Sequence, residues 1–336
     1  MNDALLRAGV GLLPVLSFLA ALLLLDSYKL LRLRLVLGVV GVGAAVAGVS
    51  YLVAAGLLGA TPLSLPAYSR YVAPVVEECL KALVVVALVR AHRIGFLVDA
   101  AILGFAAGAG FAAAENLWYL RLVPDAPLGT WIVRGFGTAL MHGGATAITG
   151  VLGLALFERR ERAKLAGFLP GLGLAVLLHS AFNHFFLSPR ASTVGIVLVL
   201  PPLLWAVFRR SERSVGEWLG KGFDADTAML ELINSGTFAG SPVGRYLHAL
   251  RDKFEGPVVA DLLCYLRLHT ELSLRAKGIL MLRENGFEAP VDDSVRDTFA
   301  ELRYLEKSIG RTGVRAIQPM LAMCHKDLWQ LYMLGK

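Results

Sequence analysis

The chain has 336 residues, of which 56% are hydrophobic and 18% are charged, and its formal net charge is +7. A soluble globular protein has nearer one quarter charged residues, so this composition excludes an ordinary soluble chain. The positive excess lies in residues 1–210, which have 17 basic and 9 acidic residues, whereas residues 211–336 have 16 and 17. The charge therefore indicates membrane topology and not a nucleic-acid-binding surface.

Seven apolar segments are long enough to cross a bilayer, whose hydrocarbon core needs about 20 helical residues. They are residues 8–25, 35–59, 71–89, 96–119, 131–157, 166–187 and 193–208. In the fourth segment Gly104, Gly108 and Ala112 recur at helical spacing, which predicts close contact with neighbouring helices. We therefore expect an all-α, polytopic membrane bundle of about seven transmembrane helices in residues 1–210, followed by a helical soluble domain in residues 211–336.

Basic residues in the connecting segments alternate between the two sides of this predicted bundle. Twelve fall on one side and five on the other, which satisfies the positive-inside rule. We predict a multi-pass cell-membrane protein with its N-terminus outside and its C-terminus in the cytoplasm. The twelve are Lys29, Arg32, Arg34, Arg90, Arg93, Arg159, Arg160, Arg162, Lys164, Arg209, Arg210 and Arg213; the five are Arg7, Arg70, Arg121, Arg134 and Arg190.

Four of the predicted spans contain ionisable or amide side chains. Charged groups cost a few kcal/mol each at mid-membrane, so such a cluster indicates function. At about 1.5 Å per residue, all four groups lie within about 16 Å of the outer boundary, in one layer. They are Glu77, Glu78 and Lys81 in the third span, Glu115 and Asn116 in the fourth, His142 in the fifth, and His179, Asn183 and His184 in the sixth.

The spacing within these segments suggests how the side chains are arranged. Glu77 and Lys81 are four residues apart on one helix face and are predicted to pair. Glu78 projects about 100° away and is free to point into the bundle. His179 and Asn183 lie one helical turn apart.

Two chemistries suit this set of carboxylates and imidazoles. One is a zinc site with an open water position, with the ligands Glu78, Glu115, His142 and His179. The other is metal-free, with a glutamate acting as general base on water and His or Asn groups stabilising the oxyanion. Both predict hydrolysis within the membrane.

The motifs and their order resemble those of a known family. EECLK at 77–81 matches EExxK, FAAAEN at 111–116 matches FxxxEN, and His142 and the HxxxN of His179 to Asn183 follow. Over residues 65–190 the chain resembles the PrsW family of bacterial intramembrane proteases, distantly related to the CAAX prenyl endopeptidase superfamily. The prenyl endopeptidases differ at the second motif, with His where this chain has Glu115.

The resemblance implies that the chain cleaves a peptide bond in a membrane-embedded protein substrate, in some members an anti-sigma factor during stress signalling. It also implies a catalytic pair, Glu77 and Glu78, and a site completed by Glu115, His142 and His179. Asn183 is placed with this catalytic group as the end of the last motif, and Lys81 and Asn116 are structural support.

Residues 211–336 show apolar residues at spacings of three and four, which predicts helices. We expect a regulatory or interaction domain with a cytoplasmic partner and no nucleic acid. Two other classes remain open for the whole chain, an ion-coupled transporter and a non-catalytic seven-helix sensor that signals through this domain. A cleavage assay on Glu78→Gln, Glu115→Gln and His179→Ala variants separates these classes from a protease.

Overall fold

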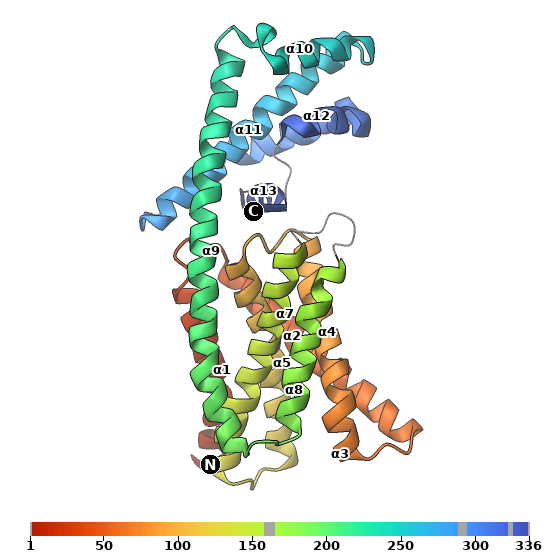
Figure 1. Cartoon of the computed structure of the whole chain (residues 1–336), viewed down its shortest axis with the longest axis vertical. Helices are drawn as coiled ribbons and strands as arrows, with labels where there is room; N and C mark the ends of the chain where they lie inside the picture. The colour runs from red at the N-terminus through yellow and green to blue at the C-terminus, as the bar shows by residue number, and fades with distance from the viewer. Residues whose placement is uncertain (1, 158–164, 288–293, 322–324, 335–336) are drawn as a thin grey trace. The chain divides into compact units, whose positions relative to one another are not determined.

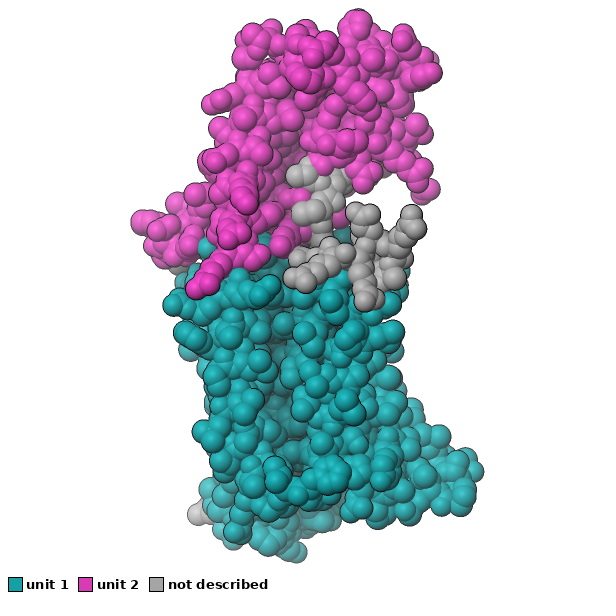
Figure 2. All heavy atoms as spheres, viewed as in Figure 1, with its two compact units in different colours: residues 1–212 teal, residues 213–336 magenta. Residues whose placement is uncertain are grey.

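The computed structural model describes residues 2–157, 165–287, 294–321 and 325–334. Within these ranges all regular secondary structure is helical, so the predicted all-α, polytopic architecture is confirmed. The chain divides into two compact units, residues 1–212 (unit 1) and 213–336 (unit 2), which are coloured separately in Figure 2. Of the predicted loop cations, Arg159, Arg160, Arg162 and Lys164 lie outside the described residues.

Unit 1 is a bundle of long helices joined by short connections and short helical turns (Figure 1). The beginnings of α1 and α9 lie at the same end of this unit as α3, so the long helices alternate in direction along the chain. The elements are α1 (Asn2–Leu24), α2 (Leu33–Ala60), α3 (Leu65–Ala67), η1 (Tyr68–Val72), α4 (Ala73–Arg90), α5 (Leu97–Leu122), α6 (Leu128–Ile132), η2 (Val133–Ala139), α7 (Leu140–Phe157), η3 (Leu165–Phe168), α8 (Leu169–Asn183) and α9 (Pro189–Asn234).

Six helical stretches among the described residues are long and apolar enough to cross a membrane. They coincide with six of the seven predicted spans, within a few residues at most ends. The predicted third span corresponds to α4, which is not among the six and which contains Glu77, Glu78, Lys81 and Arg90. It nevertheless packs against α2, α5, α7 and α8 inside the bundle. Glu78 and Lys81 are therefore buried among neighbouring helices, whereas Arg90 is exposed at the end of α4.

The last predicted span, 193–208, is only part of a longer helix. Helix α9 has 46 residues and continues from unit 1 into unit 2. No proline follows Pro202 before Pro242, and Arg, Glu and Lys are as compatible with a helix as the apolar residues before them. A change from apolar to charged composition therefore marks a change of surroundings and not the end of the helix.

Helix α5 forms the centre of unit 1 and is buried from Val98 to Ala112. Its small residues let other backbones come into contact, as their spacing predicts. A Cβ on Gly104 would lie 2.8 Å from the Thr146 carbonyl oxygen of α7, and one on Gly108 would overlap the His142 carbonyl group. Close packing of α5 on α7 therefore fixes the position of His142 along the helix axis, next to the end of α5 that carries Glu115.

Unit 2 is formed by the last part of α9 and by the helices that follow it. Helix α11 packs against both α12 and α13 and contributes a row of buried residues that includes Leu262, Leu266 and Leu280. The elements are η4 (Phe238–Gly240), α10 (Pro242–Ala249), η5 (Leu250–Asp252), α11 (Gly256–Glu284), α12 (Ser294–Ile317), η6 (Gln318–Met320) and α13 (His325–Leu334).

Candidate active site

Two of the four helices that carry the predicted site, α4 and α7, each follow a π-helical segment. η1 (Tyr68–Val72) leads into α4, and η2 (Val133–Ala139) leads into α7. π-helical turns recur at functional sites because they change the direction of the side chains that follow. The backbone of η1 also fastens α8, since Ser180 Oγ donates to the Arg70 carbonyl at 2.7 Å and Asn183 Nδ2 donates to the Ser69 carbonyl at 2.9 Å.

Helices α4, α7 and α8 contribute a connected group of side chains that are each at most 3% exposed to solvent. These are Glu78, Lys81, His142 and His179. Lys81 Nζ lies 2.6 Å from Glu78 Oε1 and 3.0 Å from His142 Nδ1. The same Glu78 oxygen lies 2.8 Å from His179 Nδ1. The Glu78 carboxylate therefore pairs with a lysine and orients a histidine ring at once.

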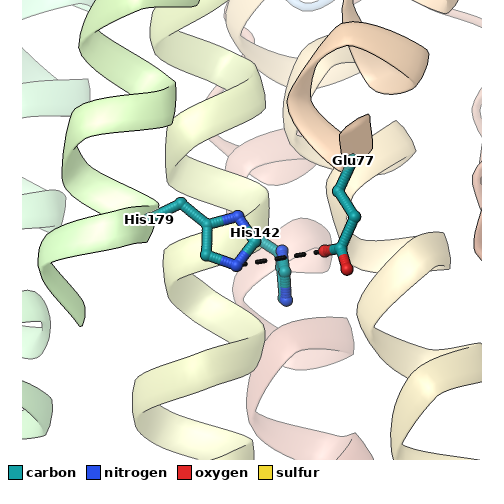
Figure 3. Close-up of side chains that lie close together, drawn as sticks. All are labelled: Glu77, His142 and His179. Atoms are coloured by element: carbon teal, nitrogen blue, oxygen red, sulfur yellow. Dashed lines mark ion pairs between the residues drawn. The ribbon is translucent and has the colours of Figure 1, made fainter. Parts of the chain in front are cut away.

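Glu77 points toward the two histidines from the other side (Figure 3). Its Oε2 lies 3.9 Å from His179 Nε2 and is buried without a hydrogen-bond partner among the described residues. One ligand atom each from Glu77, His142 and His179 lie within 4.8 Å of one another. The two rings meet edge to face, with centroids 4.7 Å apart.

Glu115 on α5 completes the group at its more open side. Its Oε2 lies 3.4 Å from His142 Nε2 and 3.2 Å from an Arg134 guanidinium nitrogen. Arg134 Nε also donates to Asn116 Oδ1 at 2.8 Å, and Asn116 Nδ2 donates to the Gly11 carbonyl at 2.7 Å. Arg134 and Asn116 are therefore positioning residues that fix Glu115 against His142 and tie α5 to α1.

The predicted pair between Glu77 and Lys81 is wrong. Lys81 pairs with Glu78, three residues earlier, because the ammonium group lies between Glu78 and His142 inside the bundle. Glu77 turns to the His179 ring instead. The group that could hold a metal ion contains two of the predicted ligands, His142 and His179, with Glu77 as its third member. The other two predicted ligands lie beside the same histidines, Glu78 2.8 Å from His179 Nδ1 and Glu115 3.4 Å from His142 Nε2.

The other predicted site residues lie as follows. Asn183 contacts the backbone of η1, one turn beyond His179. His184 Nδ1 contacts the Ser180 carbonyl, and its ring stacks on Phe186. Sequence reasoning assigned Arg134 to the outer loops although it lies within the predicted span 131–157, where a buried base needs a carboxylate partner. The location of Arg134 inside a predicted span was the feature from which a contact with a buried carboxylate could have been predicted.

The residues present fit a bound divalent metal. Two imidazoles and one carboxylate form a ligand set that zinc commonly takes, with a position left for water. His179 has the carboxylate partner on Nδ1 that orients a metal-binding imidazole, because Glu78 lies 2.8 Å away. The buried Glu77 Oε2 has no hydrogen-bond partner among the described residues, and a bound cation would supply one interaction for it. His142 differs, since its Nδ1 faces the Lys81 ammonium.

Comparison with known proteins identifies a family for the chain. No curated protein and no solved structure matches the chain. The model of the family described as PrsW family intramembrane metalloprotease matches residues 31–207, more than half of the 336 residues, and includes every member of the buried group. Six apolar helices, a cluster of buried ionisable residues and this match lead to one conclusion: the chain belongs to the PrsW family of intramembrane metalloproteases.

Proposed function

We propose that this protein is a metal-dependent endopeptidase that hydrolyses a peptide bond in a membrane-associated protein. The observation that carries the proposal is the convergence of Glu77, His142 and His179 from three helices within an apolar bundle. Burying ionisable groups in a membrane costs free energy, so such groups usually have a function, and a hydrolytic site is one that suits these three residues. Family membership supports the reaction class.

In this mechanism Glu77, His142 and His179 hold the metal, zinc being the ion that best suits the donor set. Such an ion would act as a Lewis acid that polarises the scissile carbonyl and would lower the pKa of a bound water. Glu78 accepts a hydrogen bond from His179 Nδ1 and keeps that ring in one orientation. Lys81 balances the charge of Glu78.

Glu115 is the residue that we propose to accept and return a proton during hydrolysis. It lies beside His142, and Arg134 holds its carboxylate in place. Its side chain is 26% exposed and that of Glu77 is 15% exposed, whereas Glu78 and Lys81 are buried. Water and the substrate backbone therefore enter from the side of Glu77 and Glu115.

We further propose that the N-terminus lies outside the cell membrane and unit 2 in the cytoplasm. The support is the excess of basic residues in alternate connections, although Arg134 no longer counts as a loop residue. The long helices of unit 1 alternate in direction (Figure 1), as this topology requires. The site then opens to the outer half of the bilayer.

Metal analysis of the purified full-length chain tests the proposed mechanism. We expect one divalent ion per chain, lost in His179→Ala and Glu77→Gln and retained in His184→Ala, whose ring lies outside the ligand group. A chelator should stop cleavage, and adding zinc should restore it. Cleavage that continues in a metal-free, chelator-treated protein would instead support the metal-free glutamate mechanism.

Substrate capture tests the proposed reaction. A Glu77→Gln variant should bind but not cleave its substrate, so proteins that cross-link to it and accumulate uncleaved in cells are candidates. By the family resemblance, a membrane-anchored anti-sigma factor is the first to examine. If wild-type protein cleaves none of the captured proteins in reconstituted membranes, the proposed activity is wrong.

A further inference from the structure

Four basic residues of unit 2 follow one another at intervals of four along α12. They are Arg303, Lys307, Arg311 and Arg315, and all four are exposed. In a straight helix they would extend over about 18 Å and drift around the axis by about 40° at each step. Like charges at this spacing also destabilise a helix. The four cations are therefore expected to lower the stability of α12.

A kink changes how these cations are placed. Gly310 has φ 63° and ψ 177°, which interrupts the helix between Lys307 and Arg311. Such a conformation is essentially restricted to glycine, because a Cβ atom would clash with the backbone. The two helical pieces bend around a hollow of about 610 Å³, and all four cations line it. All four cations therefore line one hollow at the bend.

The charges in this hollow are unbalanced. Glu306 is its one acidic lining residue, and no ion pair joins any of the four cations to a carboxylate in the described part of the chain. Elsewhere in unit 2, cations do find partners, as Arg267 does with Glu271 at 2.9 Å. Glu306 leaves the hollow with a formal charge of +3.

We propose that this hollow binds a phosphate-bearing anion, either a free polyphosphate or the phosphorylated headgroup of a lipid. Guanidinium groups bind phosphate oxygens in pairs through their planar donors, and three of the four cations are arginines. A hollow of this volume suits a small ligand. A compact anion with several charges would offset the repulsion between the four side chains.

Binding of inorganic pyrophosphate to the purified full-length chain in neutral detergent tests the proposal. We expect saturable binding that weakens at least tenfold in an Arg311→Ala, Arg315→Ala double variant. An Arg251→Ala, Lys253→Ala double variant removes the same charge from another exposed part of unit 2 and should bind within twofold of wild type. Circular dichroism and thermal unfolding establish that both variants fold.

Gly310→Ala separates the shape of the hollow from its charge. This variant keeps all four cations but disfavours the kink, so we expect it to bind pyrophosphate at least tenfold more weakly. If binding in Gly310→Ala and in the Arg311, Arg315 double variant equals that of wild type, the hollow is not the site. Equally tight binding of polyglutamate would show a general preference for anions and would also overturn the proposal.

Lipid retention distinguishes the two sources of phosphate. Native mass spectrometry of protein released from bilayers of phosphatidylcholine and phosphatidic acid measures which lipid stays bound. Loss of phosphatidic acid from the Arg311, Arg315 double variant, but not from the Arg251, Lys253 control, assigns the site to a headgroup. Equal retention in both variants, together with selective loss of pyrophosphate binding, assigns it to a free polyphosphate.

Discussion

Both units of this protein bury a lysine against a carboxylate, and both pairs have an N–O distance of 2.6 Å. Lys81 with Glu78 lies in unit 1, and Lys277 with Asp226 lies in unit 2, and the lysine side chains are 0% and 1% exposed. In unit 2, Ser273 donates to Asp226 and accepts from both Lys277 and Gln330. This arrangement connects α9, α11 and α13.

The pair in unit 1 has different surroundings. Glu78 also contacts His179, and Lys81 also contacts His142. Next to them, a buried oxygen of Glu77 lacks a hydrogen-bond partner among the described residues, although it lies 3.9 Å from His179 Nε2. A buried ion pair alone does not indicate a catalytic site, since the pair in unit 2 is part of a hydrogen-bonded connection between helices. A buried carboxylate oxygen without a hydrogen-bond partner, close to two imidazoles, is the stronger indication.

Replacing Glu77 has the largest expected effect on the cleavage rate. It is the most direct test of the difference between the ion-pair surroundings in unit 1 and those in unit 2. We expect Glu77→Gln to lower the cleavage rate by more than about 10²-fold, because loss of a proposed metal ligand should exceed the effect of about 10–100-fold that follows loss of a residue supporting a ligand. Cys79→Ala changes an exposed residue on the same helix and should leave the rate unchanged. A full cleavage rate in Glu77→Gln membranes would remove the main difference between the units.

Replacing each buried lysine sharpens the comparison. Lys81→Met and Lys277→Met each leave a carboxylate without its ammonium partner, which costs about 3–5 kcal/mol of unfolding free energy. We expect only Lys81→Met to stop cleavage, since only this pair contacts the histidines. Denaturant unfolding and a cleavage assay on both variants measure the two effects separately. Loss of cleavage in a folded Lys277→Met protein would give the unit 2 pair a role in activity.

Close packing of α5 on α7 has a smaller expected effect. A Cβ in Gly108→Ala would overlap the His142 carbonyl, so the helices must separate. We expect a loss of about 1–3 kcal/mol in stability and about 10²-fold in cleavage rate, because an ångström of misplacement is enough for that. Gly48→Ala has open space around it and should be neutral or slightly stabilising. Equal behaviour of the two variants would argue against helix contact as the factor that positions His142.

The smallest effect concerns His269 in unit 2. Burial lowers the pKa of His269 from 6.5, and the nearby Asp226 and Asp327 oppose this shift while Lys277 adds to it. The folded state therefore binds a proton at His269 less tightly than the unfolded state does. The free energy of unfolding is unaffected by this histidine above pH 6.5, and it falls as the pH drops below that value. The slope cannot exceed about 1.4 kcal/mol per pH unit.

Thermal unfolding of unit 2 in the full-length chain between pH 5 and 7.5 measures this slope. His269→Gln should flatten it, whereas His248→Gln changes a histidine outside the buried cluster and serves as the control. An unchanged slope in His269→Gln would show that the pH dependence of unit 2 has another source.

The sequence alone predicted much of this protein. Apolar segments of about 20 residues have few alternatives to membrane-spanning helices, because every buried backbone group needs a hydrogen bond. The same cost of burial singled out Glu77, Glu78, Glu115, His142 and His179, and their order on successive helices indicated the family before any coordinates. Helical periodicity in residues 211–336 was sufficient to predict the helices of unit 2.

Tertiary structure decided which of these groups meet. Periodicity gives the face of a helix only to within about a third of a turn, so it could not choose between Glu77 and Glu78 as the partner of Lys81. The π-helical segments η1 and η2 and the close contact at Gly108 set the rotation and height of α4 and α7. They place Arg134 against Glu115 and leave the Glu77 carboxylate facing both histidines, because such contacts depend on distances between helices that no single segment of sequence contains.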